Sequence, residues 1–194
     1  MYLVMMMKIS AGVSNRHVHL NHGDLEKLFG VGYELHRSAD LTQPGMFKAD
    51  EVVTIKTNKS EINNVRVLGP TRLYTQVEIS KTDAYKLGLN PPIRNSGDLM
   101  GSEEITIIGP KGEVTTNGCI IATRHIHLTE EQKKYYKLEG KDTVNVLLPG
   151  EKGGIITNVY LKTASNSFFE LHLDTDDANA HLIKSGDVVE ILED

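Results

Sequence analysis

A short motif that occurs twice constrains this chain more than any other feature: RHVHL at 16–20 and RHIHL at 124–128. Both copies are rich in residues that favour strands, and in a strand the residues at positions i and i+2 project from the same face. Each histidine pair is therefore expected to face one way and the residue between to face a core: His17 and His19 around Val18, His125 and His127 around Ile126. Two imidazoles side by side supply half of a tetrahedral zinc shell. A single pair is more often an ordinary surface pair, but its repetition in the same frame favours metal binding.

The composition indicates strands joined by tight turns. The chain has 194 residues, enough for one large domain or two small ones, and it is rich in Val, Thr, Gly and Asn. Its net charge of −5, without a long Lys/Arg run, disfavours nucleic acid as a partner. A small anionic ligand remains possible, because one or two arginines are enough to hold it.

The single cysteine and the apolar start of the chain bear on its location. Cys119 excludes an intrachain disulfide, which fits a reducing compartment, and it lies in an apolar run where a buried, inert thiol is expected rather than a reactive one. Residues 1–7 are apolar but have the features of neither a signal peptide nor a membrane span, so they are interpreted as leading into a first strand. We expect a cytoplasmic protein with no membrane association.

Many short strand patterns, separated by turn residues, predict a mainly β chain with two β-barrel domains capped by short helices. Residues 31–50 are polar and mixed, with a possible strand at 33–35, and are expected to form an excursion. Each doubled-histidine strand is followed by a helix cap and a short helix, and the two copies lie 108 positions apart, which indicates an internal repeat. Helices are expected at 22–29, to 86 after a cap at Ser80 or Thr82, to about 138 after a capping box at 129–132, and to 184 after a cap at Thr175 or Asp176.

Two further residues turn one closed four-histidine site into two open sites. Glu78 and His172 each lie in an alternating segment, on the face opposite the apolar residues. One set would be His17, His19 and Glu78, and the other His125, His127 and His172. Three protein ligands with an open position are typical of catalytic zinc. The alternatives are a solvated Glu78 and a surface His172.

Three arginines are of interest near these candidates. Arg72 follows a strand end on the approach to Glu78, where a guanidinium could grip phosphate, although a surface arginine at a turn is the more frequent case. Arg16 and Arg124 precede the histidine pairs with odd parity and should point away from any metal. No serine, cysteine or lysine stands out as a nucleophile.

Several motifs together resemble the PduL family of phosphotransacylases, the phosphate propanoyltransferases. The resemblance covers nearly the whole chain and rests on the segments 13–20, 64–70, 75–80, 96–99, 122–128 and 171–176. It implies reversible conversion of a short-chain acyl-CoA, propanoyl-CoA or acetyl-CoA, and phosphate into acyl phosphate and CoA. It also implies a dinuclear zinc site between two β-barrels, with residues 1–15 and 123–194 in one barrel and 16–122 in the other.

Transferred position by position, the resemblance assigns the two zinc ions to the six ligands named above and phosphate to Arg72. It further implies a possible homodimer and a link to propanediol degradation in bacterial microcompartments. About ten residues precede the first motif, so packaging through an N-terminal extension is not expected.

The expected chemistry is direct attack of phosphate on the thioester, assisted by zinc and without an acyl-enzyme. Two alternatives stay open: a dinuclear zinc hydrolase, and a non-enzymatic, zinc-stabilised binding module.

Overall fold

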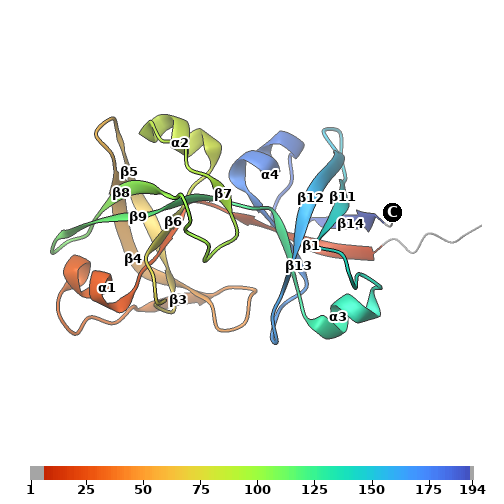
Figure 1. Ribbon diagram of the computed structural model, residues 1–194, viewed down its shortest axis with the longest axis horizontal. Helices are drawn as coiled ribbons and strands as arrows, with labels where there is room; N and C mark the ends of the chain where they lie inside the picture. The colour runs from red at the N-terminus through yellow and green to blue at the C-terminus, as the bar shows by residue number, and fades with distance from the viewer. Residues whose placement is uncertain (1–6, 193–194) are drawn as a thin grey trace, which may run out of the picture. The chain divides into compact units, whose positions relative to one another are not determined.

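The computed structural model describes residues 7–192, so most of the apolar segment at 1–7 lies outside the described residues. The chain divides into two compact units, which are described separately (Figure 1). We call Asn15–Ala122 the central unit. The terminal unit comprises the described residues up to Ser14 together with those from Thr123 onward. Both units are built mainly from strands, which confirms the predicted fold class.

The central unit is a closed ring of six strands. Around the ring the order is β4 (Phe47–Lys56), β5 (Glu61–Gly69), β2 (His17–His19), β6 (Gln76–Glu78), β9 (Glu113–Ala122) and β8 (Glu103–Ile108), which pairs with β4 again. Two short strands extend it: β3 (Arg37–Asp40) pairs with β4, and β7 (Ile93–Arg94) with β9. The unit also contains the helices α1 (His22–Phe29) and α2 (Lys81–Leu87).

The terminal unit is a second closed six-stranded barrel. Its order is β1 (Met7–Ser14), β13 (Glu170–Asp174), β10 (His125–Leu128), β12 (Gly154–Thr163), β11 (Thr143–Leu148) and β14 (Val188–Leu192), which pairs with β1. Its helices are α3 (Glu130–Tyr135) and α4 (Thr175–His181).

The two rings have the same connectivity, which extends the predicted repeat to whole barrels. Each doubled-histidine strand, β2 or β10, lies between a parallel neighbour (β5 or β12) and an antiparallel neighbour (β6 or β13). On its other side the antiparallel neighbour pairs in parallel with a further strand, β6 with β9 in the central unit and β13 with β1 in the terminal unit. That strand directly precedes the doubled-histidine strand of the other unit in the sequence. The chain therefore exchanges one strand of each repeat between its two barrels.

Helix caps define where each short helix begins. Asn21, Ser80, Thr129 and Asp174 each accept a hydrogen bond from the third residue of the helix that follows, as expected for N-caps. The predicted capping box at Thr129 and Gln132 is confirmed. Two helices are shorter than predicted, since α3 ends at Tyr135 and α4 at His181. The predicted cap of the last helix at Thr175 or Asp176 is wrong, because the Asp174 side chain accepts the capping hydrogen bond.

The predicted strand at 33–35 is wrong, and the strand of this region is β3 instead. The cause is the buried Glu51 carboxylate, which accepts hydrogen bonds from the Tyr33 hydroxyl (2.9 Å) and the His36 backbone N–H (3.2 Å). A side chain therefore satisfies this backbone N–H, and regular pairing begins only at Arg37.

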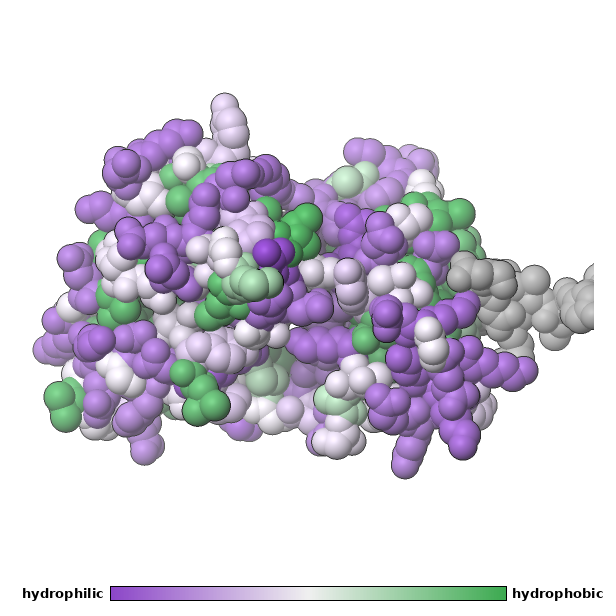
Figure 2. All heavy atoms as spheres, viewed as in Figure 1, coloured by the Kyte–Doolittle hydropathy of each residue, from purple (hydrophilic) through white to green (hydrophobic). Residues whose placement is uncertain are grey.

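Each barrel has its own apolar core. Val18, between the first histidine pair, is fully buried in the core of the central unit, and Ile126 takes the same place in the terminal unit. Both therefore face inward as predicted. On the visible face hydrophilic side chains predominate and hydrophobic ones form small separate spots (Figure 2). Among the described residues, no helix is long and apolar enough to cross a bilayer.

Candidate metal centres

The central unit brings His17, His19 and Glu78 together on neighbouring strands. In the antiparallel pair β2–β6, His17 is opposite Glu78, and the ligand atoms of all three residues lie within 4.8 Å of one another. His17 Nε2 is 3.4 Å from Glu78 Oε2. All three side chains are buried, with Glu78 only 8% exposed, so the alternative of a solvated Glu78 is wrong.

The terminal unit brings His125, His127 and His172 together in the same way. In the pair β10–β13, His125 is opposite His172, and the ligand atoms again lie within 4.8 Å of one another. The Nε2 atoms of His125 and His127 are 3.0 Å apart. The three rings are partly exposed rather than buried.

Both groups fit a zinc ion in donor type and spacing. Neighbouring ligands of a tetrahedral zinc ion with Zn–N distances of about 2.0–2.1 Å are about 3.3 Å apart. The 3.4 Å and 3.0 Å separations match this spacing. In each group the first histidine donates from Nδ1 to a backbone carbonyl, His17 to Asn15 (2.8 Å) and His125 to Thr123 (2.7 Å). These bonds place a proton on Nδ1, so that Nε2 is the ring nitrogen that can bind a metal once its own proton has been released.

The central group is electrostatically polarised. Burial lowers the pKa of His17, but the adjacent Glu78 carboxylate outweighs burial and raises this pKa above its ordinary value. Burial alone would raise the pKa of Glu78, yet the adjacent His17 holds the pKa of this carboxyl well below its usual range. Burial, together with the charge on His17, lowers the pKa of His19 well below its ordinary value. His19 is therefore a neutral imidazole, the form that binds metal.

A hydrogen-bond chain links Arg72 to the central group. Arg72 Nη1 donates to Ser96 Oγ at 3.0 Å, and Gln76 Nε2 donates both to Ser96 Oγ (2.8 Å) and to Glu78 Oε1 (2.5 Å). The Arg72 backbone N–H donates to the Leu20 carbonyl, directly after the histidine pair (2.9 Å). The structure thus connects Arg72 to the Glu78 carboxylate through two side chains. Sequence reasoning did not select Gln76 or Ser96 for a role, although both lie in segments that carry the family resemblance.

The arginines that precede the histidine pairs hold helices. Arg16 Nε is 2.7 Å from Asp83 in α2, and Arg124 Nη2 is 2.9 Å from Asp177 in α4. In both units the arginine thus ties the start of the histidine strand to the helix after the third-ligand strand. Both guanidiniums are engaged by helical aspartates, consistent with the predicted orientation away from the metal groups.

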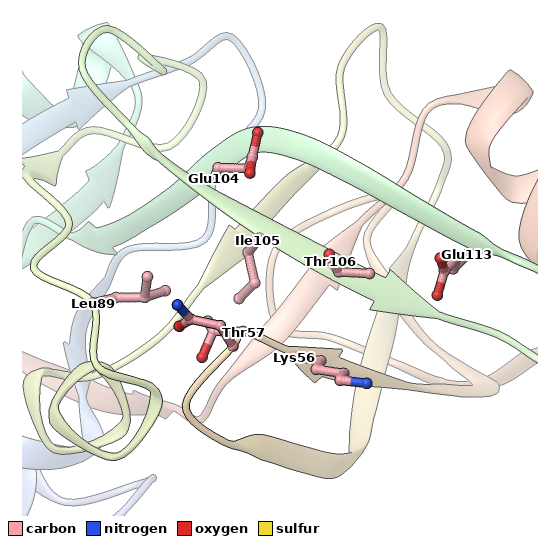
Figure 3. A pocket seen from close by; sticks show the side chains of 8 residues that line it. Lys56, Thr57, Leu89, Glu104, Ile105, Thr106 and Glu113 are labelled. Carbon is pink, nitrogen blue, oxygen red and sulfur yellow. The ribbon is translucent and has the colours of Figure 1, made fainter.

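An open groove of the central unit contains none of the predicted site residues. It is lined by Lys56, Leu89, Glu104, Glu113 and their neighbours (Figure 3). With two carboxylates and one lysine among these residues, the groove does not favour an anionic ligand such as phosphate or CoA.

Comparison with known proteins identifies the family. A model of the phosphate propanoyltransferase family matches residues 10–184. A phosphate propanoyltransferase of Thermotoga maritima is 51% identical over 187 residues, which cover 95% of this chain and 89% of the relative. Relatives of the same name from Rhodopseudomonas palustris and Salmonella typhimurium are 45% and 41% identical, over 95% and 89% of this chain and 82% of each relative. The chain therefore belongs to the phosphate propanoyltransferase family, and it is an enzyme of the acyltransferase class.

Proposed function

We propose that the chain is a phosphate acyltransferase that interconverts a short-chain acyl-CoA and phosphate with acyl phosphate and CoA, assisted by two zinc ions. Propanoyl-CoA is the first candidate substrate, by the name of the relatives, and acetyl-CoA the second. The observation that carries the proposal is that each barrel presents three side chains that could bind a metal ion on one strand pair. The proposed ligands are those of the central group, His17, His19 and Glu78, and those of the terminal group, His125, His127 and His172.

In the proposed reaction Arg72 binds phosphate. Its Nη1 is held by Ser96 and by the Tyr74 hydroxyl (3.3 Å), which fixes the plane of the guanidinium while its other N–H groups remain able to donate to phosphate oxygens. A phosphate oxygen then attacks the thioester carbonyl carbon, the C–O bond forms, and the C–S bond breaks to release CoA thiolate. Zinc, when bound, supplies a Lewis acid for the carbonyl oxygen and a favoured partner for thiolate. Arg72 offsets the negative charge that develops in the transition state.

The transfer is proposed to be direct, without an acyl-enzyme. Cys119, the single thiol, is fully buried in the core of the central unit. Burial raises the pKa of its thiol to about 12, so the nucleophilic thiolate is scarce at neutral pH. Isolation of a covalent acyl adduct after incubation with acyl-CoA alone would refute direct transfer.

We further propose that zinc in both metal groups is required for the reaction. Homodimerisation, a cytoplasmic location and any association with a microcompartment stay predictions, which size-exclusion chromatography and localisation of a tagged chain would test.

The deciding experiment measures thiol release from propanoyl-CoA with and without phosphate. A phosphate acyltransferase releases thiol only when phosphate is present, whereas a zinc hydrolase releases it without phosphate. The R72Q variant is expected to remain folded and lose about 100–1,000-fold in turnover, the range for removal of one group that stabilises transition-state charge. The R72K variant keeps the positive charge but loses the planar fork of donors, so its turnover should lie between those of the wild type and R72Q.

A further inference from the structure

Each metal group occupies three of the four positions of a strand ladder. In the central unit the opposed pairs are His17 with Glu78 and His19 with Gln76. In the terminal unit they are His125 with His172 and His127 with Glu170. Opposed residues of an antiparallel pair, and residues two apart on one strand, project from the same face. Gln76 and Glu170 are therefore equivalent fourth residues, one beside each group.

The carboxylate changes position between the two ladders. In the central unit the carboxylate is Glu78, and the fourth residue is an amide that donates to it and holds Ser96. In the terminal unit the third ligand is His172, and the fourth residue is the carboxylate of Glu170. Three neutral imidazoles contribute no charge toward a dication, whereas two imidazoles and a carboxylate contribute −1. With Glu170 included, both ladders contribute the same charge.

The structure holds Glu170 against the ring of His172. The Glu170 residue is 5% exposed, and its Oε2 lies 2.8 Å from His172 Nε2. At this distance His172 Nε2 donates a hydrogen bond to the carboxylate, which leaves Nδ1 of the same ring for a metal. The carboxylate is thus placed to act on the same cation as His172.

A glycine on the neighbouring strand leaves the space that this carboxylate occupies. Gly12 of β1 is the partner of His172 in the parallel pair, and the equivalent partner of Glu78 is Ile120 of β9. A Cβ added at Gly12 would lie 3.1 Å from both Glu170 Cδ and His172 Cδ2. The terminal unit therefore has a residue without a side chain at the position where the central unit has isoleucine.

We propose that Glu170 belongs to the metal-binding set of the terminal unit, where its carboxylate orients His172 and supplies the negative charge that three imidazoles lack. This inference rests on the proposed metal-dependent function and deepens it. Loss of a carboxylate that orients a ligating histidine typically costs about 10–100-fold in metal affinity.

The test measures zinc affinity, independently of turnover. Metal-stripped wild type, E170Q, E170D and E190Q are titrated with zinc in competition with a chromophoric chelator. The wild type should bind two equivalents, and E170Q should bind one of them at least tenfold more weakly and leave the other unchanged. In an H172A background, E170Q should have no further effect. Glu190, a carboxylate of the same barrel paired with Lys8 (3.7 Å), is the matched control, and E190Q should match the wild type.

The possible outcomes separate this inference from the proposed function. Unchanged binding of both equivalents in folded E170Q overturns the role of Glu170 and leaves metal-dependent transfer intact. A wild type that binds no zinc overturns both. If E170Q does not fold, E170D decides the question, because it keeps the charge on a shorter side chain. Intermediate affinity of one equivalent then supports the proposal, and wild-type affinity of both overturns it.

Discussion

The substitution G12A tests the geometry of the terminal metal group without removing any ligand. Gly12 does not have a positive φ, so alanine introduces no backbone strain, and its only effect is the added methyl group. This Cβ would lie 3.1 Å from His172 Cδ2 and 3.2 Å from Glu170 Oε2. Both contacts are closer than ordinary van der Waals separations, so the two side chains must move by a few tenths of an ångström.

The size of the expected effect follows from the tolerance of a metal site. Ligand distances at such sites vary by only about 0.2 Å, which is less than the displacement that the methyl group requires. Misplacement of the shell around one ligand typically lowers metal affinity about 10–100-fold. Each factor of ten corresponds to about 1.4 kcal/mol. We therefore expect G12A to weaken one of two zinc equivalents by this factor and to lower turnover at limiting zinc.

The assay is zinc competition with a chelator, combined with phosphate-dependent thiol release. The matched control is G23A in α1, where the nearest contact of an added Cβ is an ordinary 3.5 Å and alanine favours the helix. G23A should bind zinc as the wild type does and unfold at a higher temperature. G12A with wild-type affinity for both equivalents would show that the space at Gly12 has no bearing on the metal group.

Three further predictions address the barrels and the thiol. I126A removes a fully buried side chain between His125 and His127 and should lower the free energy of unfolding by about 2–5 kcal/mol in urea denaturation. The control I155A, at a site 58% exposed, should change this free energy by no more than about 0.5 kcal/mol, and equal effects would contradict the assigned core. Hydrogen bonding to Glu51 raises the pKa of His36, so this pair stabilises the fold below about pH 6.5 and its contribution is lost as the pH rises through the raised pKa. H36Q should therefore lower the midpoint of thermal unfolding more at pH 6 than at pH 9, and a larger loss at pH 9 would refute this reasoning. Cys119 should react with iodoacetamide at pH 8 only after unfolding in urea, and rapid alkylation of the folded chain would contradict its burial.

Local sequence patterns were sufficient to predict where three of the four helices start and the direction in which the histidines face, whereas the cap of α4 is Asp174 and not the predicted Thr175 or Asp176. Alternation around Val18 and Ile126 fixes which side chains share a face, and this information is contained in five residues. The cap at Asn21 and the stop at Gly30 delimit α1 in the same local way. Such features depend on neighbouring residues alone, and the structure confirms them.

Features that depend on strand register were not accessible in this way. Glu170 has the same parity as His172, but its place opposite His127 follows from the alignment of β13 with β10, which are more than forty residues apart. The link from Arg72 to Ser96 likewise requires two separate loops to meet. The incorrect strand at 33–35 has a similar origin, because the buried Glu51 carboxylate replaces the ladder partner there.

The central claim is that acyl transfer depends on metal ions held by the two strand ladders. The most direct test is to strip the protein with a chelator and restore zinc stepwise while phosphate-dependent thiol release from propanoyl-CoA is measured. The account predicts that the stripped protein is inactive and that full activity returns only at two zinc ions per chain. Full activity in the metal-free protein would contradict it.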